Sequence, residues 1–280
     1  MEISSPIGLI AGGGTMPFAV ADSVKARGLD PVIFALKGLC DPKGAERFRH
    51  HWITVGQLGR ATKLLRAENC KNLIFIGSMV RPALSEVRLD WGTLRVIGPI
   101  WAAFRGGDDH LLTGIGRIFE RQGFHLVGVK EIAPDLLLSE GCATRKVPDQ
   151  DAMADIAKGR EVLRALGPFD IGQAVVVIDG HVIGVEGIEG TDELLARIKT
   201  LRVAGRIRAK PGRGVLVKAP KSKQDVRFDL PTIGPRTIEG LAAAALAGVS
   251  AAAGNTAVAD PQTMIEAADA ADLFVVGQPG

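Results

Sequence analysis

Short apolar runs alternate with helix-like segments along the first part of the chain. Residues 7–11, 32–36 and 73–76 are continuously apolar. Residues 17–27 begin with a proline suited to a first helical turn, and residues 57–69 place leucines and an alanine on one helical face. Continuously apolar strands between helices predict a parallel sheet that is covered on both faces.

The same pattern continues to the end of the chain with a different order of elements. An Asp-Gly pair at 179–180 separates two strand-like runs and predicts a hairpin. The predicted helices are 108–122, 149–166, 191–200, 237–247 and 264–270, and the predicted strands are 124–129, 173–178, 181–185, 215–218, 224–228 and 273–276.

A polar stretch at 139–148 contains Gly141 and Pro148 and has no periodicity. It predicts a linker between a domain at 1–138 and a domain at 149–280. The fold class is therefore α/β with two domains.

Composition excludes several classes of protein. The chain has 280 residues, of which 46% are hydrophobic and 23% charged, which is typical of a folded globular protein rather than a disordered one. A net charge of +3 is too small to indicate nucleic acid, and an aromatic content of 5% with no tyrosine disfavours base-stacking surfaces.

Three widely spaced cysteines, at 40, 70 and 142, indicate neither a disulfide framework nor a metal site, so we expect a reducing compartment. The first residues lack the basic start of a signal peptide. No apolar run is long enough to predict a membrane span; the Ala-rich stretch 241–253 predicts a packed helix followed by a strand or turn.

Four glycine or charge-rich segments are candidates for chemistry. The first is Gly12, Gly13, Gly14 and Thr15, between a strand and a helix. Glycines allow a ligand close to the backbone, and the helix start favours a phosphate or sugar hydroxyl, although a tight turn alone also explains them. The third glycine and the acidic residue of a dinucleotide site are missing, and no P-loop pattern occurs.

The second segment contains Asp108, Asp109 and His110 at the start of a predicted helix. Asp108 is suited to capping the helix. Asp109 is then available for Mg²⁺ or a ribose hydroxyl, whereas His110 is more typical of a helix surface.

The third segment joins residues 170–173 to residues 186–192, where glycines and acidic side chains lie between a strand and a helix. Thr191 or Asp192 caps the helix, and the helix start either receives a phosphate or forms only an acidic surface turn.

The fourth segment, residues 215–231, is the most informative. Lys218, Lys221 and Lys223 surround a proline, and the predicted strand after them would carry Asp225, Arg227 and Asp229 on one face. Cations suit a pyrophosphate, and a carboxylate among them would stay ionised and hold Mg²⁺ or orient water. A solvated edge strand is the alternative.

These segments resemble the LpxI-type UDP-2,3-diacylglucosamine pyrophosphatases of lipid A synthesis. The resemblance rests on IGLIAGGGTMP, GDDHLL, DIGQAVVV, VEGIEGTDELLAR and LVKAPKSKQDVRFDLPTIGPRTIEG, which together span nearly the whole chain. It implies a Rossmann-like parallel-sheet N-terminal domain and a family-specific mixed α/β C-terminal domain, with substrate held between them.

The resemblance also implies an activity. Water would attack the sugar-side phosphorus of UDP-2,3-diacylglucosamine and release UMP and 2,3-diacylglucosamine 1-phosphate (lipid X). A divalent cation, usually Mg²⁺, would be required. The enzyme would work in the cytoplasm, with peripheral contact to the inner membrane, and a homo-oligomer is compatible with the sequence.

The resemblance assigns Asp225 as the leading catalytic carboxylate and as a metal-ligand candidate. The remaining candidates are substrate-binding residues: Gly12, Gly13, Gly14, Thr15, Asp108, Asp109, Gln173, Gly190, Thr191, Asp192, Lys218, Lys221, Lys223, Gln224 and Arg227. Two other functions stay open, a non-catalytic module that binds nucleotide sugars and an NAD(P)-dependent oxidoreductase. Release of UMP distinguishes the first from an enzyme, and titration with NADH tests the second.

Overall fold

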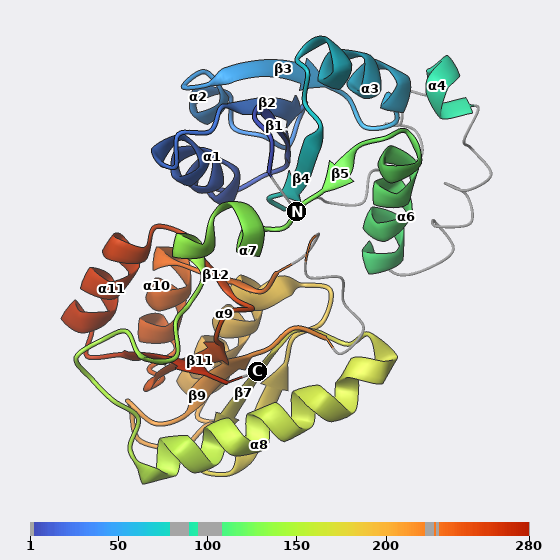
Figure 1. Cartoon of the computed structure of the whole chain (residues 1–280). Coiled ribbons are helices and arrows are strands. Elements are labelled where there is room, and N and C mark those ends of the chain that lie inside the picture. The colour runs from blue at the N-terminus through green and yellow to red at the C-terminus, as the bar shows by residue number, and fades with distance from the viewer. Residues whose placement is uncertain (1–2, 79–89, 95–107, 222–226, 228–229, 280) are drawn as a thin grey trace. The chain divides into compact units, whose positions relative to one another are not determined.

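The computed structural model describes residues 3–78, 90–94, 108–221, 227 and 230–279, without the side chains of 91, 94 and 108–112. The chain divides into two compact units (Figure 1). The first comprises Met1–Leu136 with Asp225–Asp229, and the second comprises Leu137–Gln224 with Leu230–Gly280.

The first unit contains a parallel sheet of five strands in the order β3-β2-β1-β4-β5. The strands are β1 (Ile7–Ala11), β2 (Pro31–Leu36), β3 (Arg49–Ile53), β4 (Asn72–Ile76) and β5 (His125–Leu126). All residues of β1 and β2 are buried, so their continuous hydrophobicity reflects helices on both faces. The predicted parallel sheet is confirmed.

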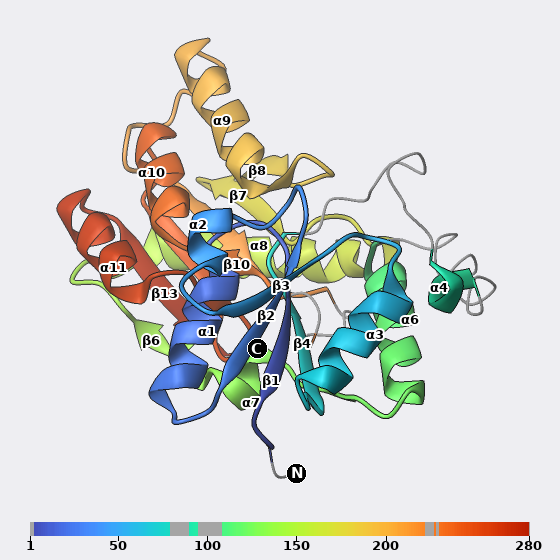
Figure 2. The same ribbon diagram turned by 90° about the horizontal axis from the view of Figure 1, so that it is seen from above.

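Helices cover this sheet from both sides, as Figure 2 shows for α1 on one side and α3 and α6 on the other. Phe34, Leu65, Leu73 and Phe119 form one of the two interfaces and are almost fully buried. The described helices of this unit are α1 (Met16–Ala26), α2 (Pro42–Ala45), α3 (Leu58–Ala67), α4 (Trp91–Leu94), α6 (Asp108–Arg121), α7 (Val129–Ile132) and the 3-10 helix η2 (Pro134–Leu136).

The second unit contains a mixed sheet of six strands in the order β6-β13-β11-β9-β7-β8. Strands β9, β11 and β13 are parallel, and β7 runs antiparallel to both β8 and β9. The strands are β6 (Gly141–Cys142), β7 (Ala174–Ile178), β8 (His181–Val185), β9 (Val215–Lys218), β11 (Gly248–Ala252) and β13 (Phe274–Gln278). A separate pair joins β10 (Thr232–Ile233) to β12 (Ala257–Val258).

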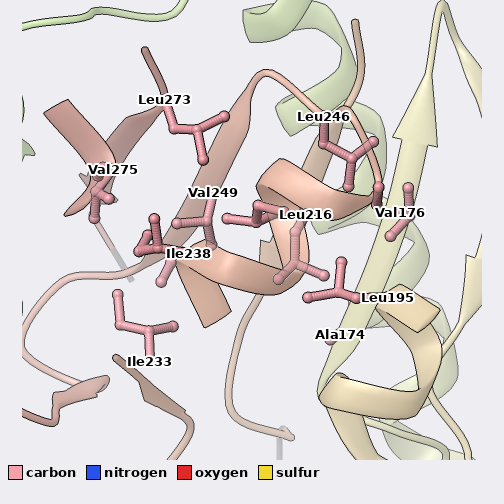
Figure 3. Close-up of a cluster of buried hydrophobic side chains, with 14 of the residues drawn as sticks. Ala174, Val176, Leu195, Leu216, Ile233, Ile238, Leu246, Val249, Leu273 and Val275 are labelled. Atoms are coloured by element: carbon pink, nitrogen blue, oxygen red, sulfur yellow. The ribbon is translucent and has the colours of Figure 1, made fainter. Parts of the chain in front are cut away.

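The two faces of this sheet have different helical covers. α8 (Gln150–Leu166) lies along one face (Figure 1). There Ile156 and Leu163 belong to one buried cluster with Val175 and Val217. The other face packs against α9 (Gly190–Val203), α10 (Pro235–Ala243) and α11 (Pro261–Ala270). Figure 3 shows this core, which includes Leu195, Ile238 and Val249. The parallel first sheet and mixed second sheet confirm the predicted fold class.

Some predicted elements differ from those observed. The predicted strand 124–129 is shorter, because only His125 and Leu126 pair with β4. Within the predicted strand 224–228, the described residue Arg227 lies in a turn, so that prediction is wrong there. By contrast, the packed helix followed by a strand or turn that was predicted for residues 241–253 is confirmed, because they contain the end of α10 and strand β11. Residues 139–148, predicted as a linker, include β6, which pairs with β13.

Candidate functional site

The glycine-rich loop after β1 is held by backbone hydrogen bonds to the end of β4. The Gly12 N–H donates to the Ile76 carbonyl at 2.9 Å, and Gly13 and Ser78 exchange two bonds at 2.8 and 2.9 Å. Gly77 has φ +96°, and a Cβ there would lie 2.6 Å from the Gly13 oxygen, so this approach requires glycine.

This loop lies where a doubly wound sheet usually binds ligands. From β1 the chain proceeds to β2 and β3 on one side, and β4 and β5 lie on the other side of β1. The carboxyl ends of β1 and β4 therefore flank the point where the strand order reverses. Gly14 and Thr15 are exposed there, and Thr15 precedes α1 without capping it through its side chain.

Asp108 and Asp109 begin α6, as the sequence predicts. Because α6 lies between the parallel strands β4 and β5 in the chain, a crossover connection places its start at the carboxyl edge of the sheet. Their side chains lie outside the described part of the structure.

In the second unit, polar residues follow the strands at one edge of the sheet. Strands β8, β9, β11 and β13 run in one direction and end at this carboxyl edge. Lys218 ends β9 opposite Ala174 of β7, and the N–H of Glu186, just after β8, donates to the Ala174 carbonyl at 2.9 Å. Glu186 and Lys218 thus lie in one row across neighbouring strands.

Lys218 is buried, with 6% of its surface exposed. It lies two residues after Leu216 on β9 and so projects to the same face, which α9 covers. Its Nζ donates to the Thr191 hydroxyl at 2.8 Å and to the Thr232 carbonyl at 3.0 Å. The lysine that the sequence predicts as a phosphate ligand is therefore fixed by tertiary contacts.

Thr191 connects Lys218 to Glu186, of which 8% is exposed. The Thr191 hydroxyl donates to Glu186 Oε1 at 2.6 Å, and the backbone N–H of Gln173 donates to Oε2 at 2.7 Å. In the sequence, Glu186 stands out only as part of an acidic stretch. A glutamate directly after a strand was the available signal, but its burial depends on contacts between distant segments.

Gln173 joins this network through its backbone. Its carbonyl accepts from the Ala219 N–H at 3.0 Å. The preceding Gly172 has φ +53°, and a Cβ there would lie 2.2 Å from the Glu186 carbonyl oxygen. The structure thus brings together three predicted site residues, Gln173, Thr191 and Lys218, with Glu186 between them.

Other predicted residues make separate contacts. Lys221 forms an ion pair with Asp170. In the first unit, Arg227 donates to Glu120 at 3.1 Å, with both side chains more than one third exposed. Asp192 pairs with the exposed Arg236 at 2.7 Å, so it lies outside the buried network. Gly190 begins α9 with φ +81°, a conformation that favours glycine.

Lys223, Gln224 and Asp225 lie outside the described residues. Within the ranges that are described, no three His, Cys, Asp or Glu side chains gather as a metal site would require. The side chains of the predicted Mg²⁺ candidates Asp109 and Asp225 lie outside the described part of the structure.

Comparison with known proteins covers both units. The profile of the LpxI N-terminal domain matches residues 6–136, and that of the LpxI C-terminal domain matches residues 139–276. A protein of Caulobacter vibrioides (strain ATCC 19089 / CIP 103742 / CB 15), named UDP-2,3-diacylglucosamine pyrophosphatase LpxI, is 41% identical over 271 residues, which cover 97% of this chain and 96% of that protein. With both domains matched in order, this chain belongs to the LpxI family.

Proposed function

We propose that this chain hydrolyses the pyrophosphate bond of UDP-2,3-diacylglucosamine and releases UMP and 2,3-diacylglucosamine 1-phosphate, as a step of lipid A biosynthesis. One observation carries the proposal: the match to a pyrophosphatase with this substrate in its name extends over 97% of the chain. It therefore includes the glycine loop of the first unit and the Lys218 network of the second.

The geometry within each unit is consistent with this chemistry. Phosphoryl transfer depends mainly on positioning and on neutralising phosphate charge. The glycine loop after β1 leaves Gly14 and Thr15 exposed at the carboxyl edge, which suits the nucleotide part of the substrate. The fixed ammonium of Lys218 and the nearby Lys221 suit the phosphate charge.

The proposed reaction forms one bond and breaks one. Water oxygen bonds to the sugar-side phosphorus, the bond from that phosphorus to the bridging oxygen breaks, and UMP leaves with the bridging oxygen. The proton of water passes to a base. We assign this role, or the alignment of water, to Asp225, with Lys218, Lys221, Lys223, Gln224 and Arg227 around the phosphates.

A divalent cation, most simply Mg²⁺, is part of the proposal. Carboxylates are the ligands that Mg²⁺ prefers, and Asp108, Asp109 and Asp225 would hold it. When bound, Mg²⁺ supplies charge neutralisation at the phosphate oxygens. Removing it with EDTA should abolish turnover, and adding excess Mg²⁺ should restore turnover.

The lipid part of the substrate requires an apolar surface, which we place among the helices of the second unit. No helix in the described ranges is long and apolar enough to cross a membrane. We propose peripheral contact with the cytoplasmic face of the inner membrane, tested by sedimentation of the protein with lipid vesicles.

The direct test incubates the purified chain with UDP-2,3-diacylglucosamine and Mg²⁺ and measures UMP. The proposal predicts UMP with an equal amount of lipid X. Substrate binding without UMP would instead support a non-catalytic module, and saturable binding of NADH would support an oxidoreductase.

Asp225→Asn should lower turnover by about two to four orders of magnitude while keeping the fold. Near-normal release of UMP by this variant would refute the assignment of Asp225.

A further inference from the structure

Glu186 is a buried carboxylate to which the proposed reaction gives no role. It follows β8 and lies two hydrogen bonds from the Lys218 ammonium, with Thr191 between them. Its second carboxylate oxygen accepts the N–H of Gln173. Both carboxylate oxygens are thus engaged, and the side chain is held at the carboxyl edge of the second sheet.

The hydrogen bonds that link Lys218, Thr191 and Glu186 have one consistent direction. A carboxylate only accepts, and a threonine hydroxyl has one proton to donate. Thr191 therefore gives its proton to Glu186 and turns its lone pairs toward Lys218. An ammonium only donates, so the Lys218 bond fits this orientation. Glu186 thereby determines which way the Thr191 hydroxyl points.

The charges of these groups also connect Glu186 to Lys218. Burying an ammonium is costly unless hydrogen bonds and a nearby opposite charge compensate. Two of the groups that contact Lys218, the Thr191 hydroxyl and the Thr232 carbonyl, accept from its ammonium and are neutral. Glu186 adds a negative charge immediately behind Thr191, in surroundings where low solvent exposure strengthens the attraction.

We propose that Glu186 is a positioning residue for the reaction. Acting through Thr191, it holds the Lys218 ammonium charged and fixed at the carboxyl edge, where the ammonium binds a phosphate oxygen of the substrate. Glu186 itself does not touch the substrate. The inference rests on the proposed function, because Lys218 needs a phosphate ligand.

The first test compares Glu186→Gln with Glu189→Gln in UMP release. Glu189 lies on the same loop but pairs with Arg197. Loss of a charge-assisted hydrogen bond predicts that Glu186→Gln lowers kcat/KM by about 10- to 100-fold, whereas the control stays within about 2-fold. A fall in melting temperature at unchanged kcat/KM would mean a structural role only and would overturn the proposal.

A double-mutant cycle separates positioning from folding. In a Lys218→Met background the ammonium is absent, so Glu186→Gln should change kcat/KM by no more than about 2-fold. The same loss in both backgrounds would contradict action through Lys218. Where turnover is too slow to measure, the same coupling can be obtained from binding. The dissociation constant for 2,3-diacylglucosamine 1-phosphate is then measured for wild type, the two single variants and the double variant.

Thr191 variants keep the test valid if Glu186→Gln does not fold. Thr191→Ser retains the hydroxyl and should keep kcat/KM within about 3-fold, whereas Thr191→Val removes it and should lose about 10- to 100-fold. Equal activity of the two variants would overturn the proposal. Wild-type protein that binds the lipid phosphate but releases no UMP would refute the proposed function alone, and the binding cycle would still decide the role of Glu186.

Discussion

For Lys218, the sequence predicts the type of ligand, whereas the tertiary structure determines how the side chain is held. The sequence marks it as a cation near a proline-containing loop, which suits phosphate. Its burial and its bonds to Thr191 and Thr232 come from segments that lie 27 and 14 positions away. Such contacts fix a long side chain and so reduce the entropy lost when a ligand binds.

Lys218→Met should therefore lower activity without unfolding the protein. Loss of the positive group that we propose binds the phosphates predicts a decrease in kcat/KM of about 100- to 1,000-fold. Methionine fills a similar volume but cannot donate to Thr191 and Thr232, so the melting temperature should fall by about 4 to 10 °C while the fold is kept. Lys199→Met, which changes an exposed lysine of α9, is the matched control. Equal activity of both variants would remove Lys218 from the site.

The three cysteines are expected to differ in thiol reactivity, because they differ in burial. Burial, with a smaller contribution from Glu68, raises the pKa of Cys70 to about 12, and burial also raises the pKa of Cys40. Cys142 is exposed. Because the thiolate is the reactive form, iodoacetamide at pH 8 should label Cys142 and leave the other two unmodified in the native protein. Peptide mass spectrometry checks this, and labelling of Cys70 before Cys142 would contradict it.

The raised pKa of Cys70 also predicts how stability depends on pH. The unfolded chain loses the thiol proton near its ordinary pKa of 9.0, whereas the folded chain keeps it up to about pH 12. The stabilising effect is therefore complete below pH 9 and is lost as pH rises from 9 to about 12. Urea unfolding between pH 8 and 11 should show a steeper loss in wild type than in Cys70→Val.

At the scale of elements, predictions succeeded where a segment is buried along nearly its whole length. The runs in β1, β2, β4, β7 and β9 are buried along nearly their full length, so their apolar pattern was sufficient. Strand β3 was missed because Arg49, His50 and His51 are polar and not fully buried. At Arg227, alternating charges suggested a strand, but a turn also presents charged side chains to solvent.

The sequence predicted which segments form the candidate site, but it did not predict which side chains contact one another there. Glycine loops and helix starts are visible in sequence, and Gly12, Gly13, Thr191 and Lys218 lie at the carboxyl edges of their sheets. Which polar atoms pair across those edges depends on the register of β7, β8 and β9. The burial of Glu186 follows from that register, and sequence alone did not supply it.

The loop before β7 gives a prediction at the element scale. Gly172 and Gly180 both have positive φ, but only at Gly172 would a Cβ meet backbone, 2.2 Å from the Glu186 oxygen. Gly180→Ala should cost about 1 kcal/mol of unfolding free energy from its conformation alone. Gly172→Ala should cost about 3 kcal/mol or more because the loop must also move. Urea unfolding compares the two, and equal losses would contradict the close contact.

At the scale of the whole molecule, each unit contains parallel strands that end in polar or glycine-rich loops. The first unit has the glycine loop after β1, which is hydrogen-bonded to the end of β4, and the second has the network of Glu186, Thr191 and Lys218. The family match includes both units in sequence order. We therefore expect activity to depend on residues from both halves of the chain.

The acyl chains of the proposed substrate give a prediction for the complete protein. Burying about four CH₂ groups is worth about 3 kcal/mol, or about 200-fold in affinity. UDP-GlcNAc, which lacks long acyl chains, should therefore show a kcat/KM at least about 200-fold below that of UDP-2,3-diacylglucosamine. Comparable turnover of the two substrates would remove the apolar surface from the account.

The most direct test of the central claim is hydrolysis of UDP-2,3-diacylglucosamine in water enriched in ¹⁸O, with both products analysed by mass spectrometry. Attack of water on the sugar-side phosphorus predicts one ¹⁸O atom in the phosphate of lipid X and none in UMP. Label in UMP, or no cleavage at all by the folded wild-type chain, would contradict the account.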